Sequence, residues 1–204
     1  MSFFGKIFKG KSNLEVSGRE KSEAERGKYM PDVNTPADER FTKNFIYNGG
    51  KFLYCLSLDE IQESFDHILL ENDWYESEVY CTNEQLQDSF KGYNLEYGKK
   101  AESAFFLTTC ESLVADNGSI LVCSKQLKDT KLNNLPKNVV VYATTSQIVN
   151  NIGEGLRAIK KRNAGSIPTN ITTIKCFESD TEEKDFMSYG SSTKNLYLLL
   201  LEDL

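Results

Sequence analysis

From about residue 41 onward, short apolar runs alternate with stripes of apolar residues at helical spacing. Three of the runs are each followed by Ser or Thr and, three residues later, by Glu or Gln, which is the pattern of a helix capping box. These boxes begin at Ser57, Thr82 and Thr144. Apolar residues then recur at intervals of three and four, which indicates amphipathic helices. The sequence therefore predicts three strand–helix units, with strands at 51–56, 78–81 and 138–143.

The third unit is the clearest, because its strand is rich in β-branched residues and is followed by a long apolar stripe. We expect one helix after Thr144 that carries this stripe on one side: Ile148, Val149, Ile152, Leu156 and Ile159.

Four further runs are strand candidates: 104–108, 119–123, 172–176 and 195–201. The ten residues between the first two are too few for a full crossover helix, so we expect at most one helical turn, at 110–114. The run at 195–201 is too apolar for an edge strand. The alternation predicts an α/β three-layer sandwich with a mostly parallel sheet of about six to seven strands.

The first forty residues differ from the rest and form an irregular N-terminal arm, which gives the expected division into 1–40 and 41–204. Residues 1–11 carry three lysines among three phenylalanines and an isoleucine. They suit either a basic amphipathic turn against a membrane or partner, or a tail that folds back on its own domain, and we favour the tail because a segment this short makes a poor interfacial helix. Residues 12–40 are polar and read as a linker or wrapping arm.

Composition and charge exclude several classes of protein and of binding partner. The chain has 204 residues, 39% of them hydrophobic, which is typical of a folded soluble protein. Its net charge of −6 disfavours nucleic acid as a partner. The five cysteines contain no Cys-x-x-Cys pair and the one histidine, His67, has no companion, so we expect reduced thiols and no intrinsic metal, cluster or cofactor. Without a signal peptide or an eighteen-residue apolar run, we expect a cytoplasmic protein and no membrane partner.

Candidate chemistry is sought where strands end, because ligands of parallel sheets bind outside the carboxyl ends of the strands. Four segments qualify: 49–51, 108–111, 115–119 and 179–181. Free amides and two hydroxyls after Thr108 would suit an anion, and the Asp-Asn-Gly-Ser turn at 116–119 would place a carboxylate beside them. We therefore expect a pocket between 108–111 and 116–119.

The two acids of this region have alternative interpretations. Asp116 and Glu111 could form a coupled acid–base pair. Alternatively, Asp116 could be structural, accepting hydrogen bonds from turn amides with a lysine as counter-charge, for which Lys51, Lys99 and Lys100 are available. We favour the structural role, which is usual for an acid that opens a tight turn.

Two stretches, FLTTCESLVADNGSILVCSKQ and LPKNVVVYATTSQIV, resemble the LUD domain, the family typified by lactate-utilization protein C. There a Thr-rich strand end leads to an Ala-[Glu/Asp]-[Thr/Asn]-Gly-[Thr/Ser] turn, and the closing GSSTKNLYLLLLED looks like the family's final strand. The similarity covers about residues 41 to 204. It implies a sheet of the kind shared with ribose-phosphate isomerases, glucosamine-phosphate deaminases and CoA transferases.

The resemblance also implies a role in oxidising L-lactate with iron–sulfur partner subunits, and a small carboxylate or phosphate as ligand. One departure weakens the expected anion site. The family's Gly-Pro-Ser-x-Thr-Ala-Asp loop is Cys176–Glu183 here, so Ser179 and Thr181 remain while the glycine is lost. The family's closing His-Gly-Pro is replaced by Tyr189-Gly190-Ser191.

Three functional hypotheses follow: a LUD-type subunit of a lactate or related organic-acid utilization system, a non-catalytic interaction subunit of the same fold, or an independent transferase or isomerase. Whether the chain forms a homo-oligomer is left open. The candidate catalytic residues are Asp116 and Glu111, and the candidate ligand-binding residues are Gly49, Gly50, Lys51, Thr108, Thr109, Asn117, Gly118, Ser119, Ser179 and Thr181.

Overall fold

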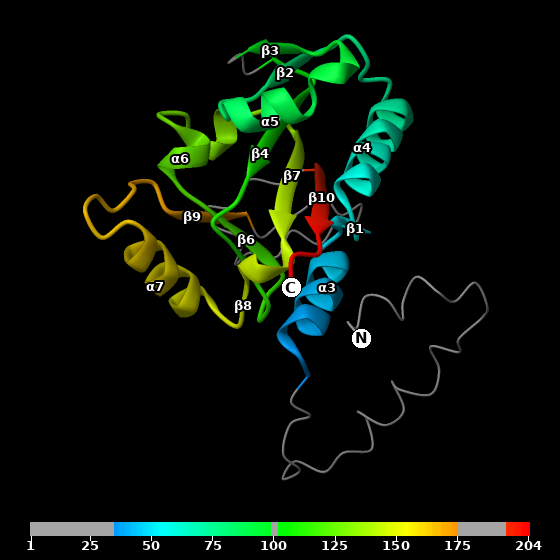
Figure 1. Ribbon diagram of the computed structural model, residues 1–204. Coiled ribbons are helices and arrows are strands. Elements are labelled where there is room, and N and C mark those ends of the chain that lie inside the picture. The colour runs from blue at the N-terminus through cyan, green and yellow to red at the C-terminus, as the bar shows by residue number, and fades with distance from the viewer. Residues whose placement is uncertain (1–34, 99–101, 175–194) are drawn as a thin grey trace, which may run out of the picture. The chain divides into compact units, whose positions relative to one another are not determined.

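Six parallel strands form the main sheet of the computed structural model, which describes residues 35–98, 102–174 and 195–204 (Figure 1). All the elements below belong to the unit Ala37–Leu204. In the sheet order the strands are β1 (Lys51–Cys55), β10 (Asn195–Leu201), β7 (Asn138–Thr144), β4 (Phe105–Thr109), β2 (Glu78–Tyr80) and β3 (Glu96–Gly98). The α/β class and the mostly parallel sheet are confirmed. Because the strands are parallel, their carboxyl ends share one edge.

Helices α4 (Leu58–Asn72) and α5 (Glu84–Ser89) cover one face of this sheet. Alternate residues of the strands point into that layer, as the two-residue period of a strand requires. Trp74 stacks on Phe105 of β4 with ring centroids 4.7 Å apart, and Phe65 of α4 packs edge-on against the same ring. The cluster buries aromatic rings from both layers and fixes α4 against the sheet.

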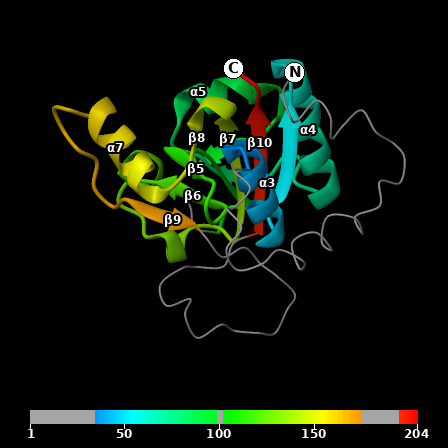
Figure 2. The same ribbon diagram turned by 90° about the horizontal axis from the view of Figure 1, so that it is seen from below.

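A second, four-stranded sheet lies on the other side of the main sheet, under helix α7 (Ile152–Arg162) (Figure 2). Its order is β8 (Ile148–Val149), β5 (Ser112–Val114), β6 (Ser119–Val122) and β9 (Thr172–Ile174). Strands β5 and β6 form an antiparallel hairpin that is buried throughout. Val114, Leu121 and Ile159 pack together between the hairpin and α7.

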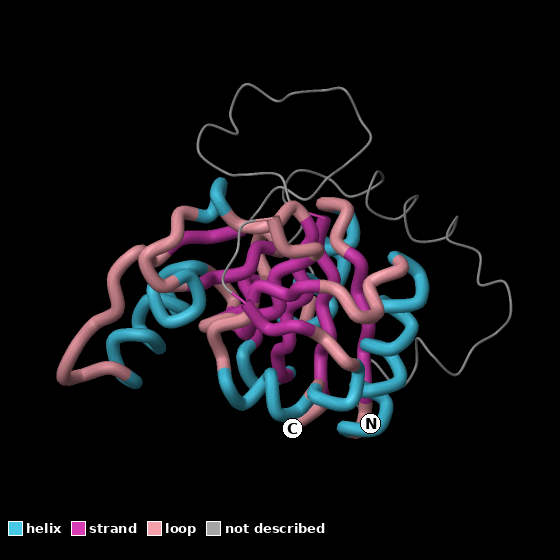
Figure 3. Tube along the Cα trace, turned by 90° about the horizontal axis from the view of Figure 1, so that it is seen from above, coloured by secondary structure: helices cyan, strands magenta, loops and turns pink. Residues whose placement is uncertain are grey.

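Helix α3 (Ala37–Tyr47) precedes β1 and packs Phe45 against Phe52 of that strand, with ring centroids 6.4 Å apart. It includes four residues of the segment that we expected to be the N-terminal arm. The remaining short elements are α6 (Ser124–Leu127), η1 (Lys91–Tyr93), η2 (Leu132–Asn134) and η3 (Thr145–Gln147). Viewed from above, the strands fill the interior and the helices lie around them (Figure 3).

Two predictions about local structure were wrong. The expected helical turn at 110–114 is strand β5, because the buried residues 112–114 pair with β6 and β8. The expected long helix after Thr144 is broken: the capping box of Thr144 and Gln147 closes only the turn η3, residues 148–149 form β8, and α7 begins after its own cap, Asn151, which accepts from the amide of Glu154.

The structure differs from other predictions in detail, at two helix caps and in the sheet to which two strands belong. Ser57 caps α4 by accepting the amide of Glu60, but the Glu60 carboxylate accepts from the amide of Leu56 instead of that of Ser57, so only half of the predicted box forms. Helix α5 is capped by Asn83 rather than Thr82, because the Asn83 side chain accepts from two amides of the first turn. The runs at 119–123 and 172–176 supply strands of the small sheet instead of the main one, and residues 175 and 176 lie outside the described part.

Candidate functional site

Glu111 leaves the end of β4 through a β-bulge. Its amide donates to the carbonyl of Leu121 at 2.8 Å, and Leu121 is also the partner of Ser112 in the hairpin. Two residues of one strand therefore face one residue of the other, an arrangement that redirects a side chain. The redirected carboxyl group of Glu111 is buried, with 6% of the residue exposed, at the edge where β4 ends.

Both carboxylate oxygens of Glu111 are engaged. Arg162 of α7 places Nη2 3.1 Å from Oε2 and donates from the same nitrogen to the Glu111 carbonyl oxygen at 2.9 Å. Gln126 donates to Oε1 at 3.2 Å, and the Cys123 thiol donates to Oε1 at 3.4 Å. A buried carboxylate requires such partners. The result is a guanidinium held in one orientation by a buried acid.

Arg162 itself is half exposed, with 47% of its side chain accessible to solvent. Its bonds within the described part of the chain use Nη2 alone. A guanidinium has five N–H donors in a planar fork, so the donors on Nε and Nη1 are available to a carboxylate or phosphate. Chemically, the pair can therefore bind and orient an anion.

The ends of β4 and β7 are tied together beside this pair. Gln147 donates from Nε2 to the carbonyl of Cys110 at 2.7 Å and accepts the amide of Thr144 at 2.8 Å. Through Cys110, the neighbour of Glu111, the turn after β7 is fixed to the same edge. The hydrogen bonds of one glutamine thus connect two adjacent strand ends.

Asp203, which follows β10, closes the same edge. Its carboxylate accepts from the Thr145 hydroxyl at 2.9 Å, the Ser146 amide at 2.8 Å and the Ser146 hydroxyl at 2.7 Å. Partial burial works against ionisation, but the hydrogen bonds from Ser146, Thr144 and Thr145 outweigh it and lower the pKa of Asp203 to about 2. Asp203 is therefore ionised at neutral pH and holds the turn after β7 by these hydrogen bonds.

The cysteines next to Glu111 are poor nucleophiles. Burial raises the pKa of the Cys110 thiol far above its usual range, the nearby Glu111 raises it further, and Arg162 offsets only part of this. Burial likewise raises the pKa of Cys123. Because the thiolate is the reactive form, these groups act as packing residues and as a hydrogen-bond donor.

The predicted turn at 116–119 is formed, and it packs on α3. Gly118 has φ of 63°, and the Asn117 side chain accepts the amide of Ser119 at 3.1 Å. A Cβ on Gly118 would lie 2.4 Å from the backbone nitrogen of Phe45, so glycine is required here by conformation and by contact. Asn48 donates to the Asn117 carbonyl at 2.8 Å.

Asp116 lies on the surface at this turn. Its side chain is 53% exposed, and its carboxylate is 3.8 Å from Nη1 of Arg40, which also donates to Asn150 at 2.7 Å. Among the described residues, the counter-charge is an arginine of α3 and not Lys51; Lys99 and Lys100 lie outside the described residues. An exposed pair of this kind contributes little to stability.

The structure does not bring Asp116 and Glu111 together. Glu111 lies at the open end of the β5–β6 hairpin and Asp116 at its closed end. At the rise per residue of a strand, the two residues are separated by a distance on the order of 15 Å. Thr108 is buried and its hydroxyl donates to the Thr109 carbonyl at 3.1 Å. Ser119 is fully buried on the hairpin, opposite Val114. Of these predicted residues, only Thr109 and Glu111 lie at the strand-end site.

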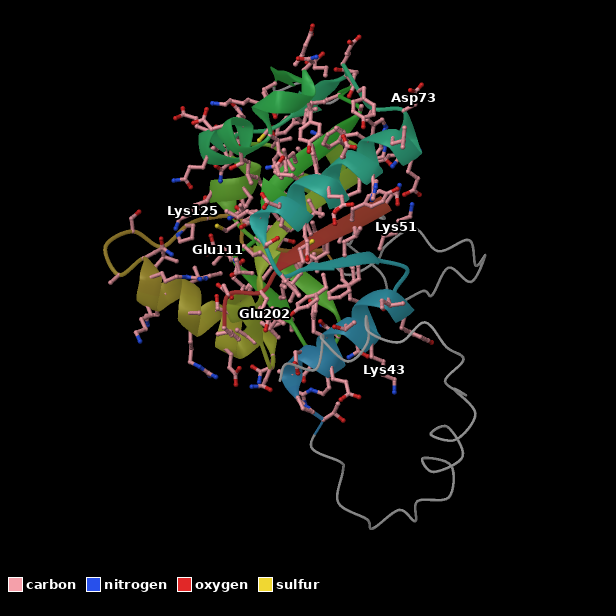
Figure 4. All side chains as sticks on the ribbon, turned by 45° about the vertical axis from the view of Figure 1, so that its right-hand side comes forward. Lys43, Lys51, Asp73, Glu111, Lys125 and Glu202 are labelled. Atoms are coloured by element: carbon pink, nitrogen blue, oxygen red, sulfur yellow. The ribbon has the colours of Figure 1, made fainter. Side chains whose placement is uncertain are left out.

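The other predicted residues lie elsewhere. Gly49, with φ of 87°, and Gly50 end α3 and lead into β1 at the amino edge of the sheet. Lys51 donates to Glu71 at 3.0 Å and to the Tyr197 hydroxyl at 2.5 Å. Partial burial lowers the pKa of Lys51, but these bonds outweigh it and the net pKa lies above its ordinary value. Figure 4 shows Lys51 at the right-hand edge of the domain, well apart from Glu111, which lies left of its centre. The remaining two, Ser179 and Thr181, lie outside the described residues.

Sequence reasoning missed Arg162 and Gln126. Arg162 ends a run of three basic residues, a pattern that usually marks a solvated helix end, and its partner Glu111 is 51 positions away. Gln126 forms the capping box of α6 with Cys123. Because cysteine is not a usual N-cap residue, the sequence pattern does not mark this box. The signal that would have found Gln126 is a glutamine three residues after a strand end, as also occurs at Gln147.

These features define an α/β domain with a parallel sheet whose carboxyl edge carries an arginine positioned by a buried acid. The chain belongs to the LUD-domain family, whose model matches residues 39–201. The resemblance seen in the sequence is thereby confirmed. A crystal structure of a DUF162 family protein from Deinococcus radiodurans has the same fold, with a TM-score of 0.58 at 13% identity over 84% of this chain and 99% of that chain.

Curated proteins yield no match. Among the helices of the described residues, none combines the length and apolarity needed to cross a bilayer. Within the same residues, no group of three or more His, Cys, Asp or Glu side chains is arranged to hold a metal ion.

Proposed function

We propose that this LUD-domain protein is a subunit of a lactate or related organic-acid utilization system, in which it binds a small carboxylate and works with iron–sulfur partner proteins in the cytoplasm. The family relationship supports a role in such a utilization system. The positioned guanidinium of Arg162 supports the ligand class, and it is the single observation that carries the proposal.

Arg162 is held in a way that suits a carboxylate ligand. Glu111 fixes Nη2 by two bonds, and Nε and Nη1 form no bond within the described residues. Holding the guanidinium in place beforehand lowers the ordering cost of binding, and each of these two nitrogens can donate a charge-assisted hydrogen bond to a carboxylate oxygen. In this proposal Arg162 binds the substrate carboxylate and Glu111 is a positioning residue.

Binding is tested by titrating the full chain with L-lactate, pyruvate and inorganic phosphate in a calorimeter. We expect lactate or pyruvate to bind and Arg162→Lys to weaken that binding about tenfold or more, because lysine keeps the charge but cannot bond Glu111 and the ligand through separate nitrogens of one rigid plane. Arg157→Lys, on the exposed face of the same helix, is the matched control and should bind as the parent protein does. Equal affinity in both variants, or phosphate binding without carboxylate binding, contradicts the proposal.

The partner part of the proposal is tested separately. Purified iron–sulfur subunits from the same system are mixed with the chain, and lactate-dependent bleaching of cluster absorbance is followed. We expect reduction to require this chain and to fall with Arg162→Lys. Cluster reduction that proceeds equally without the chain contradicts a role in the system.

A further inference from the structure

Helices α4 and α7 form opposite outer layers of the domain, with both sheets between them (Figures 1 and 2). They also carry opposite charge. The sequence of α7 contains four basic residues and one acid, whereas α4 contains five acids and no lysine or arginine. A basic face is unusual on a chain whose net charge is −6.

The outer face of α7 is cationic and is bordered by an exposed leucine. Gly155 and Ile159 are buried toward the small sheet, so the opposite side of the helix faces solvent. Arg157 and Lys160 are exposed on that side, and Leu156, 42% exposed, lies between them and the buried face. Residues 155–174 contain no acid, and Glu154, one turn before Arg157, is the single acid of α7, so the helix keeps a positive net charge.

The outer face of α4 is the complement. Ile61 and Phe65 are buried toward the main sheet, which leaves Asp59 and Glu63, one turn apart, on the side facing solvent. Leu70 lies on the same side and is 68% exposed. The face therefore offers an exposed leucine among acids, on a helix that has no lysine or arginine, so its charge is opposite to that of α7.

We propose that α7 of one copy of this protein docks on α4 of a second copy. Charge complementarity selects the occupant: the excess of basic residues on α7 is matched by the excess of acids on α4 of the same chain. The exposed apolar side chains at both faces supply the area that the contact removes from water.

Because the two faces lie on opposite sides, the contact is heterologous and joins copies head to tail. Each added copy presents a new α4 face and a new α7 face. The assembly therefore grows with protein concentration, and it weakens as salt screens the charges. This surface is separate from the pair of Glu111 and Arg162, so its failure would leave the proposed carboxylate site untouched.

The test measures the mass of the full chain by sedimentation, over a range of concentrations, in about 20 mM and about 500 mM salt. We expect mass to rise with concentration in low salt, and association to be about tenfold or more weaker in high salt. Reversing charge on α7 (Arg157→Glu with Lys160→Glu) or on α4 (Asp59→Lys with Glu63→Lys) should leave each variant monomeric in low salt. An equimolar mixture of the two variants should associate again, because each then carries the complement of the other.

Two matched controls carry the same change in net charge at other exposed positions: Glu84→Lys with Asp88→Lys, and Lys131→Glu with Lys137→Glu. Both should associate as the parent protein does, and circular dichroism should show that all four variants are folded. A parent chain that stays monomeric in low salt, variants that remain monomeric when mixed, or controls that lose association equally overturn the proposal.

Discussion

Removing the guanidinium of Arg162 should destabilise the fold, because it leaves the buried carboxylate of Glu111 without its cation. Breaking a fully buried ion pair costs about 3 to 5 kcal/mol. Here Glu111 is 6% exposed, but the Arg162 side chain is 47% exposed and Gln126 remains as a donor to Oε1. Solvent therefore screens part of the interaction, and we expect Arg162→Leu to lower the free energy of unfolding by about 2 kcal/mol.

A double-mutant cycle isolates the pair. Glu111→Gln combined with Arg162→Leu removes the uncompensated charge, so the double variant should recover about 1 kcal/mol relative to the sum of the single changes. The assay is urea denaturation at neutral pH, followed by circular dichroism, with Arg157→Leu as the exposed control on the same helix.

Two results would contradict this pairing: Arg162→Leu costs no more unfolding free energy than the control, or the effects of the two single changes simply add. Either result would mean that the carboxylate is hydrated rather than paired, and Arg162 would then not be positioned in advance of binding.

Three further outcomes follow from the geometry. Gly118→Ala should lower the midpoint of urea unfolding, at a cost of about 2 to 4 kcal/mol, because φ is 63° and the added methyl group meets the backbone of Phe45; a loss below about 0.5 kcal/mol would contradict the close approach. Asp116→Asn should change the melting temperature little, because the ion pair with Arg40 is exposed and 3.8 Å long; a large loss would show a hidden structural role. The pKa of Asp203 is depressed to about 2, so its contribution to stability is present above its ordinary pKa near about 4 and is lost as pH falls toward 2. The difference in unfolding free energy between the parent and Asp203→Asn should narrow across that window in acid titrations, and a constant difference would contradict the lowered pKa.

The main sheet could be predicted because its central strands are continuous apolar runs. Asn195–Leu201 and Asn138–Thr144 are buried on both faces, and their sequences report that burial directly. The small sheet could not be separated from the main one in the same way. Its strands have two to four residues, and their pairing depends on the hairpin turn and on a bulge that no local pattern marks.

The candidate site was predicted only in part for a related reason. The sequence showed that Thr109 and Glu111 follow a strand, and strand ends meet at one edge in a parallel sheet. It did not show that the bulge at Glu111 turns its carboxyl group toward α7, or that Arg162 arrives there from 51 positions away. Likewise, Arg40 reaches Asp116 only because α3 packs against the hairpin turn. These contacts are tertiary and have no signature along the chain.

The most direct test of the carboxylate site observes the side chain of Arg162 itself. The full chain, labelled with 15N-arginine, is titrated with L-lactate and with pyruvate while the Nε–Hε signals are followed by NMR, and Arg162→Lys assigns the signal. We expect the Arg162 signal to shift in a saturable way while the signals of Arg40 and Arg157 stay in place. An Arg162 signal that does not move while another arginine responds would contradict the site.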